Sequence, residues 1–231
     1  MVAWREAYSG SWSLLMRRSD TLDQALIEAV KIYRQKRYAE AEVLVDRILA
    51  TAPRHAGAQQ LKALLALLRG DIDRAADAAA VSLAERPGHA QTVDIARKTA
   101  LALFRAAQAD AAQGNAPRAL SRFRQALGLD RTNADGWFGL GLALQDIKDY
   151  AGAAAAFEQV GTLRPGDARA LVNRAVSLQQ SGNLGDAMAS YRLAYQTDPS
   201  TFAAISQALS AASTGLLVLD LETLRDRLSK S

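Results

Sequence analysis

The sequence predicts an all-α protein built from about five helical hairpins. First, its apolar residues are mainly Ala and Leu, with only 6% aromatic residues and five prolines, which favours helices over sheets. Second, Pro53 and Pro87 lie 34 residues apart, and so do Pro165 and Pro199. Third, small residues recur with the same period, and such periodicity is typical of stacked helical repeats.

The period becomes visible in blocks of 34 residues that begin at residues 22, 56, 100, 134 and 168. Small residues let two antiparallel helices approach closely, and large ones fill the space between hairpins. The eighth column is small throughout: Ala29, Ala63, Ala107, Gly141 and Ala175. The twentieth is Ala41, Ala75, Ala119, Ala153 and Ala187. Two other columns hold mostly large residues: Tyr38, Ile72, Ala116, Tyr150 and Leu184, and Val45, Ala79, Phe123, Phe157 and Tyr191.

The turn inside each hairpin falls at columns 15 and 16, which read KR, GD, GN, KD and GN. Gly accepts the left-handed conformation that ends a helix, and Asp or Asn caps the next one. We therefore expect Asn115 to cap a helix that has Pro117 in its first turn. Pro53, Pro87, Pro165 and Pro199 occupy one column of the blocks, and the third block has Arg131 in that column.

These columns resemble the tetratricopeptide repeat, a 34-residue helix-turn-helix unit. The best match is residues 134–167, which carry Trp137, Leu140, Gly141, Tyr150, Ala153, Phe157 and Pro165. The resemblance implies a right-handed superhelical solenoid that acts as a scaffold or adaptor in protein–protein interaction. The abundance of Arg and Ala suits a GC-rich bacterial genome.

Residues 90–99 are a surplus over the repeat and contain neither Gly nor Pro. We expect them to lengthen the first helix of the third hairpin to roughly 23 residues and about 35 Å. That helix would bend the stack or separate two sub-arrays, and the alternative is a loop. The expected division is 1–21, an N-terminal aromatic segment; 22–89, hairpins one and two; 90–99, the insertion; 100–201, hairpins three to five; and 202–231, a half-repeat with a capping helix.

Both ends of the repeat array have candidate caps. At the C-terminal end, residues 202–213 keep first-helix phase through Ile205, Ala208, Leu209 and Ala212. A closing helix is expected after them, with Asp220 as its cap and Leu221, Leu224 and Leu228 on one face. At the N-terminal end, Trp4, Tyr8, Trp12 and Leu15 have near-helical spacing. They are either a cap or a partner-binding or self-associating arm.

The residue inventory argues against catalysis, cofactors and metals. There is no Cys, and His55 and His89 occupy the same column at corners between hairpins. The glycines of GWFGLG (136–141) lack the strand-turn-helix context of a phosphate-binding loop. A net charge of +4, scattered along the chain, does not imply nucleic acid. No run of apolar residues approaches the ~18 residues that a membrane span needs, so a cytoplasmic location is the default expectation.

The resemblance implies an extended peptide or short helix as ligand, bound to the concave surface of the first helices. Lys and Asn at columns 5 and 9, which would make a carboxylate clamp, are missing, and Arg105, Arg169 and Asn173 do not assemble one. An apolar peptide or amphipathic helix is therefore expected. The expected groove residues are Leu26, Val30, Leu64, Phe104, Gln108, Phe138, Leu142, Val172, Asn173 and Val176.

Other expectations concern the contents of this groove and the role of the protein. Gly136 and Gly139 have no role in the repeat, so their place beside Phe138 suggests room left for a ligand. The groove could also be covered by the chain's own termini. Coverage by a second copy would instead make the protein a self-associating assembly protein. A third alternative is the recognition arm or regulatory subunit of a separate enzyme.

Overall fold

The computed structural model describes residues 21–210 and 221–229, which form helices and turns without strands. It contains two compact units, Met1–Ala102 and Leu103–Ser231, each of which we describe by itself. Trp4, Tyr8, Trp12, Leu15, Ala212 and Asp220 lie outside the described residues. In the part that is described, no helix combines the length and the apolar character needed to cross a membrane.

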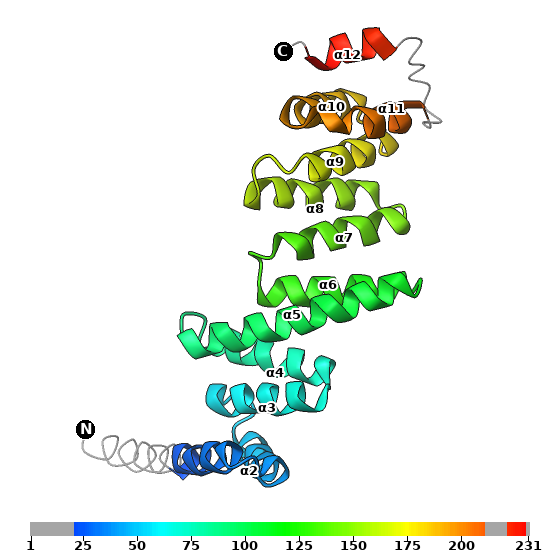
Figure 1. Cartoon of the computed structure of the whole chain (residues 1–231). Coiled ribbons are helices and arrows are strands. Elements are labelled where there is room, and N and C mark those ends of the chain that lie inside the picture. The colour runs from blue at the N-terminus through cyan, green and yellow to red at the C-terminus, as the bar shows by residue number, and fades with distance from the viewer. Residues whose placement is uncertain (1–20, 211–220, 230–231) are drawn as a thin grey trace, which may run out of the picture. The chain divides into compact units, whose positions relative to one another are not determined.

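The first unit is a succession of antiparallel helices (Figure 1). A helix over residues 21–34 is followed by α2 (Tyr38–Thr51), α3 (Ala56–Arg69) and α4 (Ile72–Glu85). The apolar faces of the first three enclose a core that includes Ala29, Ala41, Val45, Ile48 and Leu61. The helices α2, α3 and α4 begin at the positions that the blocks predict.

The next helix, α5 (Ala90–Ala112), has 23 residues. Residues 90–99 form its first turns and therefore make a helix rather than a loop. The division between the two compact units falls within α5, after Ala102.

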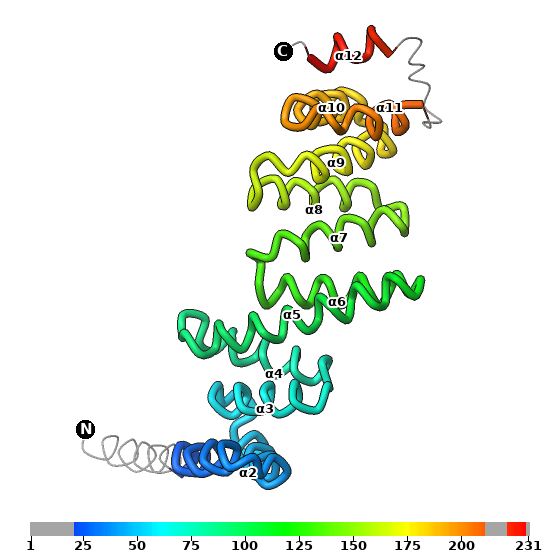
Figure 2. The backbone as a smooth tube through the Cα atoms, viewed as in Figure 1, coloured from blue at the N-terminus to red at the C-terminus, as the bar shows by residue number. Residues whose placement is uncertain are grey.

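In the second unit, the rest of α5 is followed by α6 (Ala116–Leu129), α7 (Ala134–Asp146), α8 (Tyr150–Leu163), α9 (Ala168–Gln180) and α10 (Leu184–Thr197). From α6 to α10, each helix packs against the next, as the tube in Figure 2 shows. Pro199–Thr201 forms a 3-10 turn before α11 (Phe202–Ser210), and α12 (Leu221–Ser229) comes last. The all-α fold of sequential hairpins is therefore confirmed.

The small columns lie where paired helices touch. Ala107, Ala119, Ala153 and Ala175 are completely buried, and Gly141 is buried too. A Cβ added at Gly141 would lie 2.7 Å from Cε1 of Phe157, so only Gly leaves room for that ring. The repeat thus alternates small and large residues across each helix pair, as the columns predicted.

The turns follow their predicted columns with one exception. Gly70, Gly114 and Gly182 have positive φ, and so do Lys36 and Lys148, which occupy the same column. Asp71, Asp149 and Asn183 each cap the next helix by accepting a hydrogen bond from a backbone N–H. The expected side-chain cap by Asn115 is wrong, because its side chain makes no such hydrogen bond, although Pro117 does lie in the first turn.

The closing helix α12 packs against α10 and α11. Leu224 and Leu228 are buried in the last apolar cluster, which also contains Ile205 and Leu209 of α11. Leu221 was expected on the same face, but its side chain is 54% exposed. It is the first residue of α12, and the buried residues of this helix are Leu224 and Leu228.

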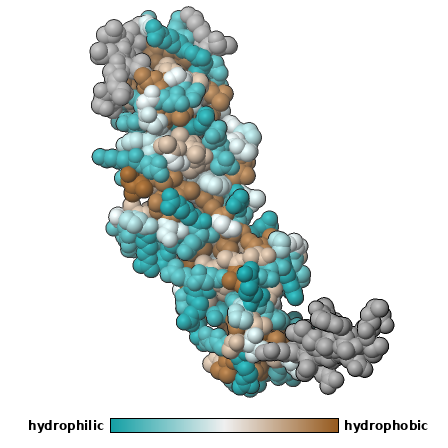
Figure 3. All heavy atoms as spheres, turned by 180° about the vertical axis from the view of Figure 1, so that it is seen from behind, coloured by the Kyte–Doolittle hydropathy of each residue, from teal (hydrophilic) through white to brown (hydrophobic). Residues whose placement is uncertain are grey.

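Both units have exposed apolar residues, among them Ile27, Val43, Leu163 and Leu193. On the face drawn in Figure 3, apolar areas are interrupted by hydrophilic side chains. Such scattering is ordinary for a protein surface. A candidate interaction site must therefore be sought where apolar side chains surround a hollow.

Candidate functional site

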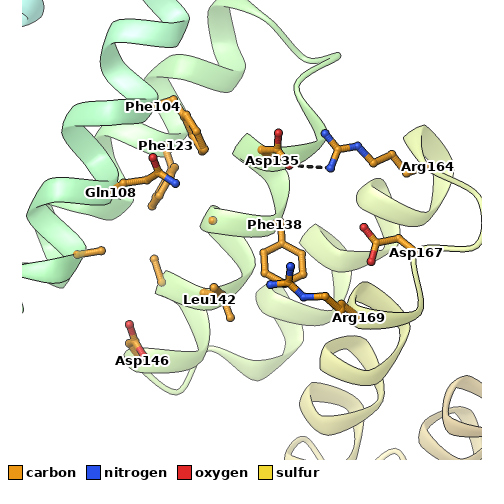
Figure 4. A pocket seen from close by; sticks show the side chains of 13 residues that line it. Phe104, Gln108, Phe123, Asp135, Phe138, Leu142, Asp146, Arg164, Asp167 and Arg169 are labelled. Carbon is orange, nitrogen blue, oxygen red and sulfur yellow. Dashed lines mark hydrogen bonds and ion pairs between the residues drawn. The ribbon is translucent and has the colours of Figure 1, made fainter. Parts of the chain in front are cut away.

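The second unit has a hollow of about 570 Å³ between α5, α7 and the start of α9, three first helices of hairpins (Figure 4). Four of the ten expected groove residues line it: Phe104 and Gln108 on α5, and Phe138 and Leu142 on α7. They meet because each holds column 5 or 9 of a neighbouring first helix. The repeat register therefore builds this surface.

The floor of the hollow is aromatic. The rings of Phe104 and Phe123 lie 5.9 Å apart, and those of Phe138 and Phe157 lie 5.3 Å apart with edge-to-face geometry. Phe123 and Phe157 are buried, whereas Phe104 and Phe138 are half-buried and face the hollow. Each outer ring is thus fixed by an inner one and presents an apolar surface.

The two glycines beside Phe138 do have packing roles, so that interpretation of the sequence is wrong. A Cβ added at Gly139 would lie 2.6 Å from Cε1 of Phe123, and one at Gly136 would lie 3.1 Å from Cδ2 of Leu127. The space at Gly139 is taken by the buried Phe123 ring. The glycine therefore lets α7 approach α6 and is not evidence for a ligand.

One edge of the hollow is an ion pair. Nη1 of Arg164, just after α8, donates to Oδ1 of Asp135 over 2.6 Å. This hydrogen bond holds the pKa of Asp135 below its usual value and raises the pKa of Arg164. Asp167 at the same edge accepts a hydrogen bond from the Ala170 N–H over 3.0 Å and thereby caps α9.

Arg169 lies over the face of Phe138, with its guanidinium carbon 5.0 Å from the ring centroid (Figure 4). This cation–π contact places a positive charge directly beside the apolar floor. Asn173, one turn further along α9, donates through Nδ2 to the Arg169 carbonyl oxygen over 2.9 Å. The Asn173 side chain thus makes a hydrogen bond within α9, and it does not line the hollow.

Sequence reasoning missed most of this edge. Asp135 and Arg169 occupy the same second column of successive repeats, so the register itself could have placed them beside Phe104 and Phe138. Arg164 and Asp167 belong to the corner between α8 and α9, whose path is not set by helical spacing. Asp146 at the end of α7 also lines the hollow, at its other end.

The other expected groove residues lie elsewhere. Val172 and Val176 on α9 pack against the cluster formed by α9 to α12, and Leu26 and Val30 pack against the core of the first unit. Leu64 on α3 is half-buried. For these positions a role in ligand binding remains a prediction.

Both histidines lie within hydrogen-bonding distance of nearby residues at helix starts. Nδ1 of His55 accepts a hydrogen bond from the Ala58 N–H over 3.3 Å and caps α3, while its Nε2 lies 3.3 Å from Oδ1 of Asp23. Nδ1 of His89 lies 3.5 Å from Oγ1 of Thr92. Over residues 21–210 and 221–229, no three His, Asp or Glu side chains are grouped to hold a metal ion.

The chain is similar to several solved structures. The crystal structure of MamA protein is 15% identical, with 79% of this chain and 94% of that chain covered and a TM-score of 0.42. YrrB, titled a TPR protein with an unusual peptide-binding site, is 18% identical over 79% of this chain and 89% of its own, with a TM-score of 0.41. TTC0263, a thermophilic TPR protein from Thermus thermophilus, is 22% identical over 82% and 98%, with a TM-score of 0.38.

No curated protein sequence matches the chain. The family described as tetratricopeptide repeat matches residues 33–90, 104–167 and 147–201, which together make up more than half of the chain. These are the residues whose hairpins keep the 34-residue register and bury its small columns. The chain therefore belongs to the tetratricopeptide repeat family, whose repeats generally mediate protein–protein interaction.

Proposed function

We propose that the protein is a non-catalytic adaptor that binds an apolar peptide or amphipathic helix of a partner protein in the hollow of its second unit. The observation that carries this proposal is the set of apolar side chains on consecutive first helices, Phe104, Phe138 and Leu142, around a hollow of about 570 Å³. An amphipathic helix uses apolar residues three and four positions apart to fill such a surface.

The exposure of these side chains supports a ligand. Leu142 is 41% exposed, although it lies in the middle of a helix whose neighbours Gly141 and Ala143 are buried. Each apolar side chain that a ligand covers contributes about 1.5 to 3 kcal/mol before ordering costs are subtracted. Two or three such anchors are enough for affinity in the micromolar range.

The polar edge of the hollow resembles the rim of an interface. Asp135 and Arg164 neutralise each other, and Arg169 is held against Phe138. At this edge a ligand therefore meets an apolar centre bordered by groups that already have partners, while Asp146 lines the other end of the hollow. The edge selects a ligand that is apolar in the middle and polar at its ends.

The experiment compares affinity capture from the native organism by wild type and by Leu142→Asp. Leu142 is preferable to Phe138, because Phe138 packs against Phe157 and its loss would also disturb the core. The matched control is Leu193→Asp, a 51% exposed leucine on α10 that does not line this hollow. Circular dichroism serves to check that each variant is folded.

We expect partners that wild type and Leu193→Asp both recover and that Leu142→Asp loses. Equal recovery by all three proteins would refute the groove proposal. Light scattering of the same proteins tests self-association. A dimer that Leu142→Asp converts into a monomer would assign the hollow to a second copy and so contradict binding of a separate partner there.

A further inference from the structure

A second hollow lies in the second unit and shares no residue with the first. It has a volume of about 550 Å³ and is bordered by the second helices α6 and α8 and by α7. Its floor is apolar, because the buried Leu127 and Leu140 line it beside the half-buried Trp137. The proposed peptide groove leaves this surface unexplained.

Trp137 is fixed in this hollow. Its indole Nε1–H donates a hydrogen bond to the carbonyl oxygen of Arg131 over 2.9 Å. This bond joins the corner between α6 and α7 to the first turn of α7. The ring is therefore held at one edge while its remaining surface contributes to the hollow.

The charged groups at this hollow are all positive. Arg124 and Arg131 line it, and no Asp or Glu does. Both arginines are exposed, and neither guanidinium has an ion pair with any residue in the described part of the chain. Arg131 stands in the column where four of the five blocks have proline, so its charge is specific to this repeat.

The next repeat provides an internal comparison. An equivalent hollow of about 360 Å³ lies 34 residues later, where Glu158 replaces Arg124 and Pro165 replaces Arg131. There, Glu158 Oε1 lies 3.4 Å from Nη2 of Arg174, so the two charges neutralise each other. The repeat thus builds this type of hollow twice in the second unit, and the earlier one alone carries two unneutralised positive charges.

We propose that the hollow formed by Arg124, Arg131, Trp137, Leu127 and Leu140 binds an acidic peptide segment of a protein partner. One apolar side chain of the segment packs against Trp137 and Leu127, and flanking carboxylates pair with the two guanidiniums. Arginine is suited to this role because its planar fork binds carboxylates with two hydrogen bonds. A nucleic acid is disfavoured, because tight phosphate binding uses many cationic contacts and only two arginines line this hollow.

Gly128 offers a variant that blocks the hollow without disturbing the core. It lies near the end of α6 and lines the hollow, and a Cβ at this position would meet no other atom within 4 Å. Gly128→Leu therefore fills the site. Its control is Gly161→Leu in the equivalent hollow of the next repeat, where an added Cβ likewise has nothing within 4 Å.

Arg131→Pro removes one charge and introduces the residue that other repeats have at this column. The preceding Asp130 has φ −145° and ψ 96°, close to the conformation that a residue before proline prefers. The acceptor for Trp137 is the backbone oxygen, which proline retains. Arg105→Gln serves as the charge control, because Arg105 is exposed and lines neither hollow.

The experiment measures fluorescence anisotropy of labelled peptides with the full chain at low salt. The probes are the pentapeptide Asp-Glu-Leu-Asp-Glu, its amide counterpart Asn-Gln-Leu-Asn-Gln, and a single-stranded oligothymidine. We expect wild type to bind the acidic peptide about tenfold more tightly than the amide peptide, a ratio that two charge-assisted contacts can provide. Gly128→Leu and Arg131→Pro should each lose most of that preference, whereas both controls and Leu142→Asp retain it.

The indole N–H signal of Trp137 reports the location of binding. It is assigned by Trp137→Phe in a nitrogen-15 NMR spectrum and should shift with the acidic peptide only. Equal affinity for the two peptides, or equal affinity of wild type and Gly128→Leu, would overturn the proposal. Binding of the oligothymidine that Gly128→Leu abolishes would assign the hollow to nucleic acid and overturn it as well.

Discussion

The phenol of Tyr191 donates a hydrogen bond to Oε1 of Gln179 over 2.8 Å, and both side chains are buried. Gln179 in turn donates through Nε2 to the carbonyl oxygen of Ala208 over 3.3 Å. A polar chain thus links α10, α9 and α11 inside the last apolar cluster. Buried polar groups of this kind stabilise a fold only while each has its partner.

Tyr191→Phe should therefore destabilise the protein by about 1 to 3 kcal/mol, because it leaves the amide oxygen of Gln179 buried without a donor. Urea unfolding measures the change. The control is Tyr195→Phe, since the Tyr195 ring packs 5.9 Å from Phe202 and its hydroxyl makes no hydrogen bond with the described residues. Equal losses in the two variants would show that the hydrogen bond is unimportant.

The free energy of unfolding should also decrease at alkaline pH because of Tyr191. Burial raises the pKa of its phenol above the ordinary value of 10.0, so the folded protein keeps a proton that the unfolded chain loses. The contribution is complete below about pH 10 and is lost as pH rises from there through the folded-state pKa. The urea midpoint should fall between about pH 9 and pH 11, and less steeply in Tyr191→Phe. Identical slopes would contradict the assignment.

The helix positions could be predicted from the sequence because they depend on a strong local signal. A 34-residue spacing of small and large residues places every hairpin from residue 22 to residue 201, and the turn column places the left-handed residues. Lys36 and Lys148 adopt positive φ in spite of their side chains, because the column sets the backbone path.

The candidate site was only partly predictable. Phe104, Gln108, Phe138 and Leu142 follow from the register, but the Asp135–Arg164 pair depends on the path of a corner and on side-chain rotamers. The meaning of Gly139 was missed for a similar reason. Its neighbour Phe123 comes from the preceding hairpin, so the contact is tertiary and has no signature within one block.

Substitutions at two helical glycines should have opposite effects. Gly139→Ala should cost about 1 to 3 kcal/mol, because its Cβ would overlap the buried ring of Phe123. Gly161→Ala should stabilise α8 by about 0.5 to 1 kcal/mol, because its Cβ meets nothing and Ala is the better helix former. Thermal unfolding of both variants measures the difference. A stabilising Gly139→Ala would mean that the space beside Phe123 is open after all.

Arg164→Gln should raise the pKa of Asp135 towards its usual 3.8, because the hydrogen bond from Arg164 is the main cause of the lowered value. A lowered carboxyl pKa adds stability above the unfolded-state value, and this contribution disappears as pH falls through the folded-state pKa. The side chains of Asp135 and Arg164 are 59% and 49% exposed, so solvent limits the effect to less than about 1 kcal/mol. Carbon-13 NMR of the carboxyl group follows the titration, and an unchanged pKa in Arg164→Gln would refute the pairing in solution.

Lys148→Gly should stabilise the turn between α7 and α8. The φ of Lys148 is 63°, and a residue with a Cβ pays about 1 to 2 kcal/mol for this left-handed conformation. Glycine removes that cost but loses about 0.5 to 1 kcal/mol of chain entropy, so the expected net gain lies between zero and about 1.5 kcal/mol. Three of the five hairpins already have glycine at this column. Lys148→Ala separates backbone strain from charge, because it removes the ammonium group and keeps the Cβ. If Ala and Gly change the urea midpoint equally, the gain comes from the lost charge and the strain argument fails.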